Sequence, residues 1–128
     1  MILRKCMSLL GIGSAQIDLI LPKETYRPGE HIVGYFLIKG GTIEQQIKRI
    51  DSDLVMIDQA TGIEKVIDTV TLLTSKLIHS GELYKKSLTY KLSSTVPITT
   101  KEISYRFKTK ITFSEGVESR DQDIIQII

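Results

Sequence analysis

Two pairs of carboxylates have a spacing that could support chemistry in this 128-residue chain. Asp51 and Asp53 are alternate residues, as are Asp121 and Asp123. Alternate side chains point to the same face of a strand, so each pair could act as a general acid and base or bind a hard cation. Aspartates are mostly exposed and solvated in folded proteins. Solvated surface groups, or groups that order a loop, are therefore the favoured interpretation of both pairs.

Histidine and cysteine are scarce and form no metal-binding or nucleophilic pattern. The histidines are His31 and His79, and the single cysteine is Cys6. Neither a Cys-x2-Cys nor a His-x3-His spacing occurs, so no zinc site is predicted. His31 is interpreted as a structural polar residue at the start of a strand, and His79 as a loop residue.

The segment Gly11-Ile12-Gly13 matches only the first part of a dinucleotide-binding loop. Gln16 stands where the third glycine belongs, and strands rather than a helix are predicted to follow. We therefore predict no catalytic residue, no cofactor and no metal ion.

Basic residues are concentrated in the second half of the chain, although the formal net charge is only +2. Residues 76–110 carry eight basic and two acidic residues. Five of these basic residues project from the solvent faces of two predicted strands that we expect to be neighbours. The partner-binding residues predicted from this stripe are Lys85, Lys91, Arg106, Lys108 and Lys110. An acidic partner could bind there, whereas the alternative is a solvated edge that lysines protect against aggregation.

Other anionic surfaces are an alternative to a protein partner. Stacking of single-stranded nucleic acid needs outward aromatic residues among the charges, but Tyr105 and Phe107 are predicted to face the core. Nucleic acid is therefore disfavoured. A membrane surface remains an alternative, because residues 1–10 carry apolar side chains at helical spacing and could form a short amphipathic helix beside the stripe.

The composition indicates strands as the elements that position these residues. The chain has 20 Ile, 6 Val and 12 Thr but only two Ala. Branching at Cβ restricts the side chain in a helix and packs well on a pleated sheet. Alternating apolar residues predict strands over 16–21, 31–39, 44–59, 63–77, 83–92, 103–113 and 124–128.

Two features of the backbone are predicted from the same pattern. Pro28-Gly29 suits the central positions of a type II turn, because glycine tolerates the positive φ that this turn requires. Apolar residues of the strand 44–59 change from odd to even positions, which predicts a bulge or bend near Arg49 to Asp51.

These elements predict an all-β fold, an antiparallel two-sheet sandwich of the immunoglobulin type. We assign residues 1–128 to one domain, with residues 1–12 as an N-terminal helix or arm. A lone cysteine cannot form an internal disulfide, and residues 1–10 lack the apolar region of a signal peptide. The cytoplasm is the expected location.

Several segments together resemble the bacterial sporulation-control family, a bacterial relative of the arrestins. The resemblance lies in Leu10 to Ala15, Tyr26 to Glu30, Gly34, Ile38 to Gly41, Glu44 to Ile47, Ser104 to Arg106 and Asp121 to Ile127. It implies an arrestin-like sandwich without catalytic activity, and a cytoplasmic regulatory or scaffolding role with protein partners. The family pattern also implies a second arrestin-like domain after Ile128.

Three functions follow from these observations. The leading hypothesis is a non-enzymatic domain that binds protein partners through sheet faces, edges and loops. The alternatives are a module that binds anionic membrane or nucleic acid, and an accessory β domain of a larger enzyme. An edge strand or residues Ile124 to Ile128 could also pair with a second copy of the chain.

Overall fold

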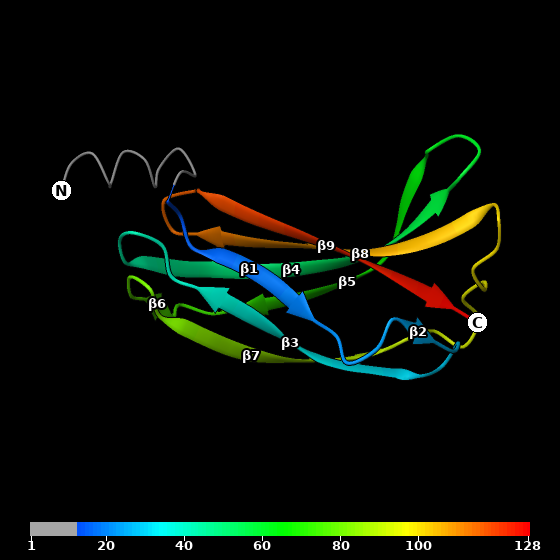
Figure 1. Ribbon diagram of the computed structural model, residues 1–128, viewed down its shortest axis with the longest axis horizontal. Helices are drawn as coiled ribbons and strands as arrows, with labels where there is room; N and C mark the ends of the chain where they lie inside the picture. Colours follow the sequence, from blue (N-terminus) through cyan, green and yellow to red (C-terminus); the bar gives the residue numbers. More distant parts are fainter. Residues whose placement is uncertain (1–12) are drawn as a thin grey trace.

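The structure, a computed structural model, describes residues 13–128, which contain nine β-strands and no helix. The strands form two sheets that pack face to face (Figure 1). The predicted all-β sandwich is therefore confirmed. Within the same residues, nothing helical is long and apolar enough to cross a membrane. The helix predicted for residues 1–10 lies outside the described residues.

The sheets contain three and six strands. The strands are β1 (Gln16–Ile20), β2 (Thr25–Tyr26), β3 (His31–Lys39), β4 (Gln45–Asp58), β5 (Glu64–Leu73), β6 (Leu77–Ile78), β7 (Leu83–Lys91), β8 (Ile103–Phe113) and β9 (Glu118–Ile127). The smaller sheet has the order β1-β3-β7, and the larger has the order β2-β9-β8-β4-β5, with β6 paired to β4.

One pair of strands departs from the predicted antiparallel arrangement. β2 and β9 pair in parallel, whereas the other neighbours are antiparallel. After β1 the chain leaves the smaller sheet and reaches the edge of β9 in the larger one (Figure 1). β2 and β9 are far apart in the sequence, so no hairpin joins them and they can pair in parallel.

β3 is the central strand of the smaller sheet, as its apolar residues on both faces predicted. Ile32, Phe36 and Ile38 point inward and are fully buried. Val33 and Tyr35 lie on the opposite face and retain contact with solvent. This strand therefore contributes both to the core and to an exterior surface.

Two glycines are required by the local geometry. Gly29 has a φ of 82°, and the Glu30 N–H donates to the Arg27 carbonyl at 3.0 Å, which confirms the predicted type II turn. At Gly41, a Cβ atom would lie 2.0 Å from the Gly13 carbonyl oxygen. Only glycine permits this close approach of the segment after β3 to the one before β1.

The predicted irregularity in β4 is present one step earlier in the chain. The register of β4 against β8 shifts between Ile47 and Arg49, so the bulge falls at Lys48. A second shift, between Leu54 and Val55, occurs against β5. Bulges increase the local twist of a strand, which fits the length and curvature of β4 (Figure 1).

The last strand is longer than predicted. Residues 114–123 were expected to form a loop, but β9 begins at Glu118 and pairs with β8 through Thr112. Its first half is polar because it lies at the open side of the sandwich, where the inward face meets the edge of β1 rather than the closed core. Hydrogen bonding to β8, rather than apolar alternation, defines this part of the strand.

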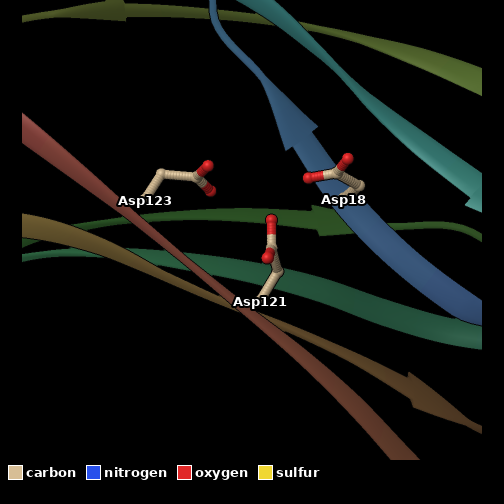
Figure 2. A group of neighbouring side chains, drawn as sticks. All are labelled: Asp18, Asp121 and Asp123. Atoms are coloured by element: carbon tan, nitrogen blue, oxygen red, sulfur yellow. The ribbon is translucent and has the colours of Figure 1, made fainter. Parts of the chain in front are cut away.

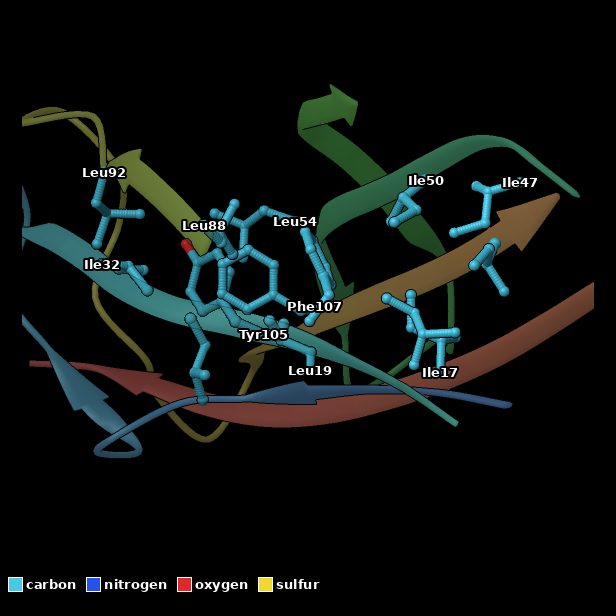
Figure 3. Packing of buried hydrophobic residues seen from close by; sticks show 14 of the residues in the cluster. Ile17, Leu19, Ile32, Ile47, Ile50, Leu54, Leu88, Leu92, Tyr105 and Phe107 are labelled. Carbon is cyan, nitrogen blue, oxygen red and sulfur yellow. The ribbon is translucent and has the colours of Figure 1, made fainter. Parts of the chain in front are cut away.

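The core fills the space between the sheets (Figure 3). Tyr105 and Phe107 of β8 are at most 1% exposed and pack with apolar residues of β1, β3 and β4, as predicted. The Tyr105 hydroxyl donates to the Pro97 carbonyl at 2.6 Å, so its polar end is satisfied. Ser52 and Thr109 are also buried, and their hydroxyls lie 3.0 Å apart. The hydroxyl groups of these three core residues are therefore hydrogen-bonded.

Candidate functional site

The basic residues that were predicted to form one stripe lie on two different sheets. β7 pairs with β3 in the smaller sheet, whereas β8 lies between β9 and β4 in the larger one. The prediction that these strands are neighbours is wrong, because residues 92–102 carry the chain from one sheet to the other. Lys85 and Lys91 therefore lie on one outer face, and Arg106, Lys108 and Lys110 lie on the other.

The outer face of the larger sheet places the lysines of β8 beside acidic residues. Lys110 lies opposite Asp51, and Lys108 lies opposite Asp53. The Lys108 ammonium also contacts Glu64 of β5, with Nζ 2.6 Å from Oε2. The charges on this face are largely compensated within the domain.

Asp51 is the most buried member of this network, with 8% of its surface exposed. Its oxygens accept hydrogen bonds from Arg49 Nε and Nη2 at 2.9 and 2.8 Å and from the Thr71 hydroxyl at 2.7 Å. The Arg49 hydrogen bonds are the main reason that the pKa of Asp51 lies below its ordinary value. Asp53 accepts from the Thr69 hydroxyl at 2.8 Å. These two aspartates are structural groups rather than a paired site.

The outer face of the smaller sheet combines apolar and basic side chains. Val33 is 55% exposed, and Tyr35 and Leu37 follow it along the same face of β3. Lys85 lies opposite Leu37, and its ammonium sits 5.0 Å from the centre of the Tyr35 ring. Lys91 lies at the end of the same face, opposite His31.

A cluster of carboxylates occupies the seam where the edges of β1 and β9 meet. Asp18 of β1 faces Asp121 and Asp123 of β9 (Figure 2), and an oxygen of each lies within 4.8 Å of the others. Asp121 Oδ2 accepts a hydrogen bond from the Leu19 N–H at 2.9 Å. This bond satisfies a free edge group of β1 and links the two sheets.

The seam favours protonated carboxyl groups. Burial is the main cause that raises the pKa of Asp123 to about 7, and the hydrogen bond and charge of Asp121 and the charge of Asp18 add to it. Burial also raises the pKa of Asp18, again with a contribution from Asp121. Asp123 Oδ2 is inaccessible to solvent and accepts no hydrogen bond from the described residues. Protons or a hard cation would relieve the repulsion among these oxygens.

Asp18 could not be assigned to this cluster from the sequence. Asp121 and Asp123 form a pair by their alternate spacing, but the third member of the cluster is more than 100 residues away in the sequence. The available signal was one acidic residue within the apolar segment Ile17 to Leu21. That signal does not identify a partner.

The histidines have the peripheral positions that the sequence predicted. His31 is exposed at the start of β3. His79 lies in a loop, and its Nδ1 is 3.2 Å from Glu44 Oε2 in an exposed pair. Cys6 lies outside the described residues.

Comparison with known sequences identifies the family. The sequence profile described as SpoOM protein matches residues 3–128. The sporulation-control protein spo0M of Bacillus subtilis (strain 168) is 31% identical in an alignment 128 positions long, which covers 95% of this chain and 50% of that protein. The chain belongs to the Spo0M family. The resemblance drawn from the sequence segments is confirmed, and the chain spans about half the length of this relative.

Solved structures agree with the family assignment. The crystal structure of Spo0M from Bacillus subtilis superimposes with a TM-score of 0.80 at 30% identity, over 91% of this chain and 50% of that one. A Niemann-Pick type C2 protein from the Japanese carpenter ant reaches a TM-score of 0.61 at only 7% identity, over 90% of this chain and 93% of that one. The second similarity shows a shared sandwich fold alone.

Proposed function

We propose that this member of the Spo0M family is a non-catalytic docking domain that contributes to sporulation control in the cytoplasm. Its sheet faces, edges and loops bind protein partners. Family membership supports a regulatory role, because the Bacillus subtilis relative is a sporulation-control protein. The docking role goes beyond that relationship and is carried by one surface.

That surface is the outer face of the smaller sheet, on which exposed apolar side chains lie next to one another. Val33 is 55% and Leu83 is 65% exposed, and Tyr35 and Leu37 are half-buried between them. Single exposed apolar residues are ordinary, but a contiguous group rimmed by polar residues is typical of an interaction site. The face is built on a central strand, so it is held rigidly.

The test is affinity chromatography on the immobilised full chain, followed by reconstitution of any retained protein from purified components. Titration calorimetry should give saturable binding that Val33→Ser weakens. Ile124→Ser is the matched control, because Ile124 is 63% exposed but lies on the other sheet. If no purified protein binds, or if both variants act alike, the docking function on this face is rejected. Turnover of a substrate by the purified chain would reject the non-catalytic role.

Binding to an anionic membrane was the alternative, and it rested on a single basic stripe together with the helix predicted for residues 1–10, which lies outside the described residues. The five residues instead divide between two faces, and those of β8 lie beside carboxylates. Sedimentation with vesicles of phosphatidylglycerol and phosphatidylcholine at low salt tests this alternative. The docking proposal expects the protein in the supernatant, and salt-sensitive recovery in the pellet would favour the membrane.

Self-association through an edge strand is a second way to use the same fold. β5 and β7 are both edge strands with one unpaired side. Sedimentation velocity over a range of concentrations shows whether copies pair. If the smaller sheet binds a different protein, as proposed, the purified chain should sediment as a monomer.

A further inference from the structure

The outer face of the smaller sheet has an apolar centre to which its three strands contribute. Val33, Tyr35 and Leu37 line the central strand β3, and Ile20 of β1 lies directly opposite Tyr35. At the other side, Leu83 of β7 lies opposite Lys39. A partner that covers this centre would remove apolar surface from water, which favours association.

Lysines surround this centre without acidic partners. Lys39, Lys85 and Lys91 are exposed on the same face. Among residues 13–128, none of the three forms an ion pair. Asp18 is the one carboxylate among the outward residues of β1, β3 and β7, and it turns toward Asp121 and Asp123 at the seam (Figure 2). The face is therefore apolar at its centre and positive at its rim.

We propose that this face binds an acidic amphipathic segment of a partner protein, in which leucine-like residues cover Tyr35 and carboxylates pair with Lys85 and Lys91. This inference rests on the proposed docking function and adds the chemistry of the partner. A neutral or basic segment would cover the lysines without supplying opposite charge, which carries a desolvation penalty. An acidic segment compensates that penalty and is steered toward the face by its charge.

Two other occupants fit the charges less well. A second copy that packs with the same face would bring the lysines of both copies together, and like charges across an interface oppose binding. Residues 1–12 of this chain contain Arg4 and Lys5 and no acidic residue. Their charge is therefore positive, like that of the rim, and the two would repel each other. Charge complementarity thus favours a separate, acidic partner.

The probe is a short monomeric peptide with leucine on one helical face and glutamate elsewhere, labelled with fluorescein. Its matched control carries lysine in place of every glutamate. Fluorescence anisotropy with the full chain should show binding of the glutamate peptide at least ~10-fold tighter than the lysine peptide, and higher salt should weaken it.

Charge reversal tests the assignment to this face. The double variant Lys85→Glu, Lys91→Glu should lower the affinity for the glutamate peptide at least ~10-fold. The control Lys65→Glu, Lys101→Glu makes the same change of net charge at exposed positions away from the face, and should change the affinity less than ~2-fold. All four lysines are exposed, and a circular dichroism melt verifies that each variant is folded. Val33→Ser should also lower the affinity for the glutamate peptide, although it does not change the net charge.

Several results would overturn the inference. If the two peptides bind equally well, the preference for an acidic partner is rejected. If the two double variants have equal effects, the assignment of the binding site to this face is rejected. If the chain dimerises and Val33→Ser abolishes the dimer, the face binds a second copy. If deletion of residues 1–12 makes the glutamate peptide bind more tightly, the face is occupied by that segment. If a native partner still depends on Val33 while the peptides do not discriminate, the docking function stands and only the acidic partner is rejected. If the glutamate peptide binds but no native protein does, the docking function is rejected.

Discussion

On the larger sheet the lysines of β8 lie opposite aspartates of β4, whereas on the smaller sheet Lys85 of β7 lies opposite Leu37 of β3. Both outer faces carry basic residues that share one side of a strand, and the sequence alone does not distinguish the two faces. The difference arises from the neighbouring strand. Positive charge on the larger sheet is compensated by neighbouring carboxylates, whereas Lys85 and Lys91 on the smaller sheet form no ion pair among residues 13–128.

This difference separates residues that stabilise the domain from residues that are proposed to bind a partner. A hydrogen-bonded, partly buried ion pair contributes to folding, whereas an unpaired surface lysine contributes little to it. Substitutions on the larger sheet should therefore affect unfolding, and substitutions on the smaller sheet should affect binding. Four stability measurements test this contrast.

The largest effect is expected at Asp51. Asp51→Ala removes the acceptor of hydrogen bonds from Arg49 and Thr71, and should lower the free energy of unfolding by about 2–3 kcal/mol. Asp53→Ala is the matched control on the same face, with the Thr69 hydroxyl as its side-chain partner, and should lose about 0.5–1 kcal/mol. Urea denaturation measures both. Equal losses would contradict the assignment of Asp51 as the centre of the network.

The seam between the sheets should show a pH dependence of the opposite sign to ordinary carboxylates. The pKa of Asp123 is raised to about 7 from 3.8, so the folded state holds a proton that the unfolded state releases in this range. The contribution is complete below about pH 4 and is lost as the pH rises toward 7. Asp123→Asn removes the ionisation and should be more stable than the natural chain by about 1–2 kcal/mol at pH 8, after allowance for solvent screening.

The control is the pH at which the natural chain and the Asp123→Asn variant are closest in free energy of unfolding. Below about pH 3 the natural carboxyl is protonated in both the folded and the unfolded state, so the difference in free energy of unfolding between the two proteins should reach its minimum there. Acidic residues with lowered pKa values, such as Asp51, contribute equally to both proteins and cancel in this difference. A difference that stays constant from pH 4 to 8 would show that Asp123 is not protonated in the folded state.

A smaller effect is expected for the ion pair between Lys108 and Glu64. Their side chains are 33% and 41% exposed, so the coupling in a double-mutant cycle should be about 0.5 kcal/mol. Lys108→Glu and Glu64→Lys should each destabilise the domain, and the combined exchange should recover most of the loss. Absence of recovery would mean that the charges on this face do not compensate one another.

The smallest effect is expected for the lysines of the smaller sheet. Lys85→Ala and Lys91→Ala should each change the free energy of unfolding by less than about 0.5 kcal/mol, because neither pairs with a carboxylate among the described residues. Thermal and urea unfolding measure this. A loss comparable to that of Asp51→Ala would erase the proposed difference between the two faces.

Much of the fold was predictable because alternation is a local signal. The bounds of β3 and β8 match the predicted ranges 31–39 and 103–113, and Tyr105 and Phe107 face the core as expected. β9 was predicted too short, because residues 118–123 are polar on both faces and only pairing with β8 makes them a strand. Alternation of apolar and polar residues identifies strands with one buried face, but it does not reveal a strand that is polar on both faces.

The candidate sites were less predictable, because each combines distant segments. Lys85 and Arg106 were assigned to one stripe on the assumption that strands close in sequence are paired, but the chain changes sheets between them. Asp121 and Asp123 were noticed as a pair, but nothing local connects them to Asp18. Strand order decides both cases, and strand order is a property of the whole chain.

The sequence by itself determined most of the strands, which of their faces are buried, where Pro28-Gly29 turns the chain and to which family the domain belongs. These properties depend on side-chain type, backbone conformation and nearest neighbours along the chain. Only the tertiary structure decided which lysines meet carboxylates and which form no ion pair among the described residues, because an outward side chain acquires its electrostatic neighbours from the adjacent strand. The same chemical group is therefore compensated by carboxylates on one sheet and lies beside apolar side chains on the other.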